Sequence, residues 1–167
     1  TEKIINKFKD NNGLYLVPAF TGLGAPHWNA NSRGVLSGIT RDTSPEEIVR
    51  ATIEAVAYQT YDLFEAMKHD GLRPKVVKVD GGMVMNNWFS QFLSDVVNVK
   101  VLRPKVQETT AAGAAFMAGL KIGVYKSLKD ISKNWHLDRN FSPKMKNNSR
   151  NLLIKGWSKA IDRALIN

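Results

Sequence analysis

The sequence predicts an α/β fold in which short apolar strands alternate with amphipathic helices. Strand-like runs are separated by single helices, the helices carry residues typical of their ends, and 43% of the 167 residues are hydrophobic. A chain of this length and composition can bury one hydrophobic core. Because strands separated by one helix usually pair in parallel through a right-handed crossover, we expect parallel pairing between them.

The first part of the pattern is a pair of strands joined by a long loop. Residues 14–18 (LYLVP) are predicted to form a short strand, and residues 35–40 a second strand that pairs with it. The connecting segment, residues 19–33, contains glycine, proline and several asparagines, which are typical of loops.

A long helix is predicted to begin after Ser44 and to continue to about residue 68. Ser44 is a suitable N-cap, Pro45 suits the first helical position, and Glu47 completes a capping box. Gly71 then favours the end of the helix.

Beyond this helix, strands and helices alternate. The expected elements are strands at 75–79 and 99–102 and helices at 87–97, 109–121, 127–134 and 148–166. The helix at 109–121 is dense in alanine and glycine, so we expect it to pack closely against another element. Its first residues, Thr109 and Thr110, are candidates for the wall of a binding cleft.

The formal net charge of +9 is concentrated towards the C-terminal end. Residues 121–167 contain 11 Lys and Arg against 3 Asp and Glu, whereas residues 1–120 contain 13 against 12. The basic side chains are spread out, without the interleaved aromatic residues of a single-strand binding surface. A solvated helical face is therefore favoured. A contact with nucleic acid, a membrane surface or an acidic partner domain is the alternative.

Several classes of site are excluded by composition. The sequence has no cysteine, which excludes disulfides, a thiolate nucleophile and a cysteine-based zinc site. His27, His69 and His136 lack ligand spacing, so we predict no metal site. Residues 111–120, the longest strongly apolar stretch, are far shorter than the ~20 residues of a membrane span, and we expect no secretory leader because no charged-then-apolar segment precedes a cleavage site. We expect a cytoplasmic protein. Because the chain begins at Thr1, we also expect a piece of a longer polypeptide, with processing as the alternative.

The most informative segment follows the predicted strand at 75–79. The chain continues through Asp80, Gly81 and Gly82 into a helix that begins near Asn86. Two adjacent glycines allow a ligand to approach the backbone closely, because neither carries a Cβ. A helix N-terminus offers unpaired N–H groups, which suit a phosphate or a hydrogen-bonding heterocycle. At the carboxyl end of a strand, this pattern indicates a nucleotide seat. An ordinary strand-to-helix turn with an asparagine cap is the alternative.

Several longer motifs, in order, resemble the C-terminal domain of the FGGY family of carbohydrate kinases. Residues 34–39 (GVLSGI) and 47–54 (EIVRATIE) are similar, residue for residue, to one of the family's two diagnostic patterns. The segments PAFTGLGAPHW, RATIEAVAYQT, DGGMVMNN and TAAGAAFMAGL are similar to the form found in members that phosphorylate glycerol. The resemblance covers nearly the whole chain.

The resemblance implies a ribonuclease H-like, actin-like ATPase domain of the α/β class. This fold has a mixed sheet with helices on both faces, and here extra C-terminal helices. Residues 1–126 would form the nucleotide-side domain, and residues 127–167 a basic helical extension packed on it. Substrate and nucleotide would meet in a cleft between this domain and an N-terminal kinase domain.

The resemblance also implies roles for individual residues. In the family, the D-G-G-x-x-x-N segment contacts the adenosine part of ATP or ADP. By position, Gly82 would lie against the nucleotide, Asn86 would hydrogen-bond to it, and Gly81 would allow the turn without direct contact. We expect Glu54 to be a structural carboxylate rather than a catalytic one. Asp80 is expected to cap backbone groups, with a role near magnesium-bound water as the alternative.

The implied reaction transfers the γ-phosphoryl group of ATP, with Mg²⁺, to glycerol, giving glycerol 3-phosphate. The sequence contains no segment like D-Q-G-T-T, G-D-Q-Q or Y-G-T-G. We therefore assign no catalytic or metal-binding residue and expect the chain alone to be inactive, with glycerol bound mainly by the N-terminal domain of a homo-oligomeric enzyme. Three alternatives stay open: a fragment of another FGGY polyol or sugar kinase, an inactive remnant of a split gene, and a basic nucleic-acid-binding module, the last being disfavoured.

Overall fold

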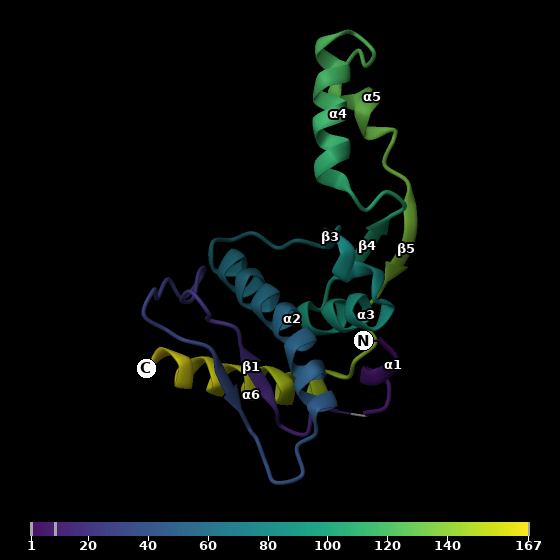
Figure 1. Cartoon of the computed structure of the whole chain (residues 1–167). Coiled ribbons are helices and arrows are strands. Elements are labelled where there is room, and N and C mark those ends of the chain that lie inside the picture. The colour runs from purple at the N-terminus through teal and green to yellow at the C-terminus, as the bar shows by residue number, and fades with distance from the viewer. Residues whose placement is uncertain (1, 9, 167) are drawn as a thin grey trace.

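The computed structural model describes residues 2–8 and 10–166. The chain forms a main body and a helical lobe that projects from it (Figure 1). The lobe consists of α4 (Thr109–Lys121) and α5 (Leu128–Ser132), and the bounds of both helices agree with the sequence prediction to within a few residues. The expectation that α4 packs closely against another element was wrong: Gly119 is its only buried residue and lies against Tyr125 in the loop that follows. No helix in these described ranges is both long and apolar enough to cross a membrane.

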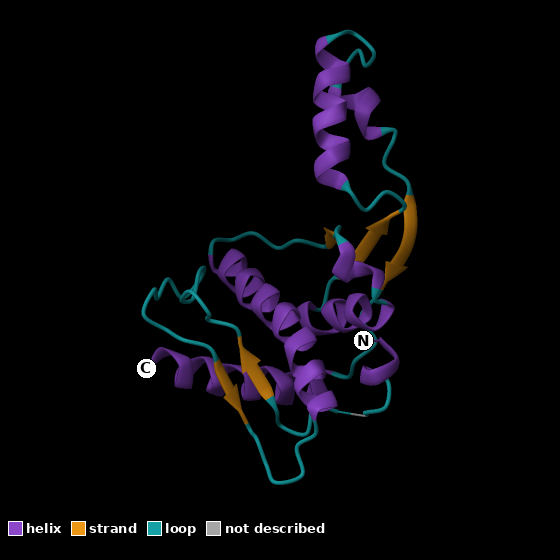
Figure 2. Cartoon of the chain, in the orientation of Figure 1, coloured by secondary structure: helices purple, strands orange, loops and turns teal. Residues whose placement is uncertain are grey.

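One side of the body is an antiparallel pair of strands, β1 (Tyr15–Val17) and β2 (Val35–Ser37), which confirms the predicted pairing. Both strands pack against α6 (Asn147–Leu165) (Figure 2). Gly156 makes this approach possible, because a Cβ at that position would lie 2.2 Å from the hydroxyl oxygen of Tyr15.

The long helix α2 (Pro45–His69) begins as its sequence predicts. The Ser44 hydroxyl accepts the backbone N–H of Glu47 at 3.3 Å, and the Glu47 carboxylate accepts the backbone N–H of Ser44 at 2.7 Å. This reciprocal pair satisfies two donors that a helix start otherwise leaves free. Along its length α2 packs against α3 (Asn87–Val97), whose bounds are those predicted.

The second sheet is mixed and has the strand order β3 (Val76–Lys78), β4 (Lys100–Pro104), β5 (Leu137–Phe141). β3 and β4 are parallel, as expected for strands separated by one helix, and β5 runs antiparallel to β4. α3 packs against this sheet.

Three features differ from the expectation. The short helix α1 (Glu2–Ile5) and the strand β5 were not predicted, and β4 continues through Arg103 and Pro104 instead of ending before them. β5 escapes a sequence prediction because four of its five residues are exposed, so it lacks the alternation of apolar and polar residues.

The hydrophobic core lies where α2, α3 and α6 meet. Buried side chains from all three helices contribute to it, including Tyr58, Phe92 and Trp157. The C-terminal helix is therefore part of the core of the body, although the segment that contains it is strongly basic.

Candidate functional site

The predicted Gly-Gly corner lies between β3 and α3. Gly81 adopts φ +84° and ψ 174°, a conformation that residues with a Cβ rarely adopt. Its backbone N–H donates to the carbonyl of Gln107 at 3.2 Å. The chain then forms a 3₁₀ helix, η1 (Gly82–Met85), before α3 begins. The structure thus assigns the turn to Gly81, and a short 3₁₀ helix stands where the sequence indicated a direct entry into an α-helix.

Gly82 is exposed and borders open space, since a Cβ added there would meet no atom within 4 Å. It opens onto a shallow cavity of about 410 Å³. The other residues that line this cavity are Glu2, Ile53, Met83, Met85 and Asn86. The cavity therefore joins two of the predicted nucleotide contacts to an apolar rim that sequence reasoning did not single out.

The two polar atoms of the Asn86 side chain have different environments. Its Oδ1 accepts the backbone N–H of Phe89 at 3.1 Å, so this residue is the N-cap of α3. Its Nδ2 is buried and has no hydrogen-bond partner among the residues described. A buried donor without a partner costs about 1–3 kcal/mol, and a ligand acceptor would remove that cost. The asparagine cap and the ligand contact were alternatives in the sequence. The structure shows the cap, and the side chain can also serve a ligand if the turn moves so that Nδ2 faces the cavity.

The start of α4 is joined to the same corner. The Thr109 hydroxyl donates to the carboxylate of Asp80. Asp80 thus contacts a side-chain hydroxyl rather than the backbone groups that we expected it to cap. Together with the bond from Gly81 to Gln107, this contact ties the segment between β4 and α4 to the corner.

Glu54 is fully buried on α2, away from solvent. Its Oε1 accepts from Nε of Arg50 at 2.6 Å, and its Oε2 accepts from the hydroxyl of Tyr58 at 3.0 Å. Burial raises the pKa of Glu54, and the Arg50 guanidinium opposes that change. The structure thus gives Glu54 the structural role that the sequence analysis favoured.

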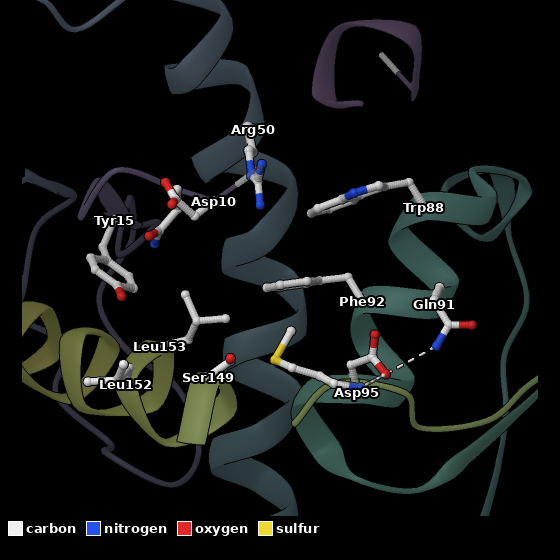
Figure 3. A pocket seen from close by; sticks show the side chains of 12 residues that line it. Asp10, Tyr15, Arg50, Trp88, Gln91, Phe92, Asp95, Ser149, Leu152 and Leu153 are labelled. Carbon is white, nitrogen blue, oxygen red and sulfur yellow. Dashed lines mark hydrogen bonds between the residues drawn. The ribbon is translucent and has the colours of Figure 1, made fainter. Parts of the chain in front are cut away.

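A larger cavity, of about 580 Å³, lies elsewhere and is bordered by side chains of α2, α3 and α6 (Figure 3). Several of its polar groups, including Arg50, Gln91 and Asp95, already have partners within the protein. The Arg50 guanidinium lies 5.2 Å from the ring centre of Trp88, and Oδ1 of Asp95 accepts the backbone N–H of Met145 at 3.0 Å. The residues predicted to contact a nucleotide do not line this cavity.

The chain matches a known family over most of its length. Residues 3–122 match the model of the FGGY family of carbohydrate kinases, C-terminal domain. The chain is 55% identical over 154 residues to glycerol kinase 1 of Pseudomonas aeruginosa, covering 92% of this chain and 31% of that protein. It is 50% identical over 166 residues to a glycerol kinase of Clostridium botulinum, covering 99% and 33%.

A solved structure shows the same likeness. The crystal structure of Plasmodium falciparum glycerol kinase with ADP superimposes with a TM-score of 0.85 and 36% sequence identity, covering 99% of this chain and 33% of that one. The fold is therefore the actin-like, ribonuclease H-like α/β fold that the motifs indicated. The chain spans about one third of the length of the relatives it matches.

Proposed function

Because the chain belongs to the FGGY family of carbohydrate kinases, we propose that it is the nucleotide-binding C-terminal domain of a glycerol kinase. The enzyme would transfer the γ-phosphoryl group of ATP to glycerol and release ADP and glycerol 3-phosphate. The observation that carries this proposal is the 55% identity to glycerol kinase 1 of Pseudomonas aeruginosa. The likeness to a glycerol kinase crystallised with ADP supports the choice of nucleotide.

The nucleotide would occupy the cavity at the Gly-Gly corner. The adenosine part would lie against Gly82, where no Cβ intervenes, and would accept a hydrogen bond from Nδ2 of Asn86. Ile53, Met83 and Met85 would contact the apolar faces of the base, since all three border the same cavity. Methionine suits such a surface because its side chain is flexible and polarisable.

The groups that act on the transferred phosphate would come from another domain. Phosphoryl transfer needs a carboxylate to orient the attacking hydroxyl, and bound Mg²⁺ supplies positive charge at the phosphates. Within residues 2–8 and 10–166, no three His, Asp or Glu side chains are placed to hold a metal ion. Because the sequence contains no segment like D-Q-G-T-T, G-D-Q-Q or Y-G-T-G, we propose that an N-terminal kinase domain provides the base, most of the glycerol contacts and the protein ligands of the metal.

The sheet offers a place for such a domain to dock. Within the described ranges β3 pairs only with β4, so its other edge has unpaired backbone groups. Val76 on this strand is 45% exposed. An exposed sheet edge is a template for a further strand. We propose that the partner domain covers it. We further propose that residues 1–126 form the nucleotide-side domain, that residues 127–167 form a basic helical extension packed on it, and that the complete enzyme is a cytoplasmic homo-oligomer.

A chimaera tests the proposal. The first two thirds of the Pseudomonas aeruginosa glycerol kinase 1 would be fused to this chain in place of its own C-terminal third. We expect ATP-dependent formation of glycerol 3-phosphate, and none from the N-terminal part alone. A folded chimaera that forms no glycerol 3-phosphate, although the Pseudomonas aeruginosa enzyme with its own C-terminal third does, would overturn the proposal.

A further inference from the structure

A buried arginine on β4 contacts the 3₁₀ turn at the nucleotide corner. Arg103 is only 5% exposed. Its Nη1 donates to the carbonyl of Val84 at 2.8 Å and to that of Met85 at 3.3 Å, and both carbonyls belong to η1. The same nitrogen donates to Oδ1 of Asn87 at 3.2 Å, on the first residue of α3. One cation thus holds the end of η1 and the start of α3.

The opposite edge of the guanidinium is held by β5. Nε and Nη2 of Arg103 each lie 2.7 Å from Oδ2 of Asp138. The guanidinium also lies 5.6 Å from the ring centre of Phe141, on the same strand. Because a guanidinium is planar and its N–H groups point in fixed directions, fixing one edge also fixes where the other edge donates.

The turn itself has little internal support. A 3₁₀ helix of four residues has few hydrogen bonds of its own, and their geometry is weaker than in an α-helix. Gly82 at its start is exposed, and a Cβ added there would meet no atom within 4 Å. The position of the turn therefore depends on groups outside it, and Arg103 supplies several of these contacts.

We propose that Arg103 is a positioning residue for nucleotide binding and that Asp138 orients it. By fixing the carbonyls of Val84 and Met85, Arg103 sets the place of Gly82 and Asn86 without touching the nucleotide. This inference rests on the proposed nucleotide site. It gives β5 a part in nucleotide binding, although this strand lies beyond residues 3–122, which the family model matches.

Nuclear magnetic resonance on the ¹⁵N-labelled chain tests the inference, because amide shifts report even weak ADP binding residue by residue. We compare the wild-type chain with the Arg103→Met and Arg103→Lys variants. Val101→Ala, on the same strand but in the hydrophobic core, is the control for lost stability. Asp138→Asn leaves the guanidinium in place and removes only its charged anchor, so it answers the same question if Arg103→Met does not fold.

We expect Arg103→Met to shift the amide resonances of Gly82 and Asn86 in the ADP-free protein. It should weaken ADP binding about tenfold, which corresponds to a turn that adopts the binding conformation about a tenth of the time. Arg103→Lys should bind ADP more tightly than Arg103→Met but less tightly than the wild-type chain. Asp138→Asn should weaken ADP binding less than Arg103→Met does. Val101→Ala should lower stability without changing ADP affinity. Equal weakening by Val101→Ala, or unchanged ADP affinity in the Arg103 and Asp138 variants, overturns the positioning role. In the chimaera described above, ADP binding that is equally tight with and without Gly82→Val overturns the nucleotide site itself.

Discussion

The indole of Trp157 stacks on the phenol of Tyr58, with ring centres 5.3 Å apart and an angle of 18° between the planes. The indole N–H also donates to Oδ2 of Asp62 at 2.9 Å. Tyr58 and Asp62 both lie on α2, so this one side chain fastens the C-terminal helix α6 to the central helix of the body. The basic C-terminal segment is anchored through its apolar face, and its charge is carried on the outside.

Replacing Trp157 should therefore destabilise the whole body. We expect Trp157→Ala to lower the free energy of unfolding by about 3–5 kcal/mol, because a fully buried aromatic side chain is lost and a cavity remains. Leu152→Ala, at a position that is 70% exposed on the same helix, is the matched control and should cost far less. Urea unfolding curves for the two variants measure the difference. Similar losses in both would contradict an anchoring role for the indole.

Asp62 predicts a pH dependence of stability. Burial raises its pKa, and hydrogen bonds from Trp157 and His27 oppose this without cancelling it. The native state therefore holds the proton more tightly than the unfolded chain does. From roughly pH 4, where an unfolded aspartate titrates, the native state binds more protons, so the contribution of Asp62 to the free energy of unfolding falls as pH rises.

The Asp62→Asn variant should lack this slope. We expect its free energy of unfolding, relative to that of the wild-type chain, to rise between pH 4 and the raised native pKa. Urea unfolding at several pH values from 4 to 7 measures this difference. A difference that is independent of pH would show that Asp62 titrates alike in the two states.

The two corner glycines should respond differently to substitution. Gly82→Val should preserve the fold and abolish ADP binding, because the side chain would enter open space that the nucleotide needs. Gly81→Val should instead destabilise the fold by about 1–2 kcal/mol, because the positive φ disfavours a Cβ. Gly24→Val, another glycine next to open space, is the control for ADP binding. Thermal unfolding and ADP titration separate these effects, and unchanged ADP binding by Gly82→Val would refute the placement of the nucleotide.

The two functions of Asn86 can be separated by Asn86→Ser. Serine retains a side-chain oxygen for the N-cap of α3 but lacks the Nδ2 donor. We expect stability close to that of the wild-type chain together with weaker ADP binding. Asn86→Ala should show the same loss of binding and an additional loss of about 1 kcal/mol of stability. If Asn86→Ser binds ADP like the wild-type chain, Nδ2 does not contact the nucleotide.

The sequence predicts those parts of the fold whose signals are local. The capping box of Ser44 and Glu47 fixes the start of α2, and the amphipathic run after Asn86 fixes α3. β5 has no such signal, because its residues are mostly polar and its partner β4 lies more than thirty positions earlier in the chain. The backbone hydrogen bonds that hold β5 extended come from β4.

Some features of the candidate site could also be predicted from local sequence, and others could not. The turn at Gly81 could be predicted, because adjacent glycines signal an unusual backbone locally. The rim of the cavity could not, because Glu2, Ile53 and Met83 come from three separate elements that meet only in the folded chain. Arg103 lies just after the strand predicted at 99–102, and its carboxylate partner Asp138 lies 35 positions further along the chain, so the sequence does not signal this pair.

A crystal structure of ADP bound to the kinase assembled from this chain and a preceding glycerol kinase domain tests the proposed nucleotide site most directly. We expect the adenosine part to lie against Gly82, with Nδ2 of Asn86 donating a hydrogen bond to it. ADP bound elsewhere, with the corner at Gly82 unoccupied and the Asn86 amide still without a partner, would contradict this placement.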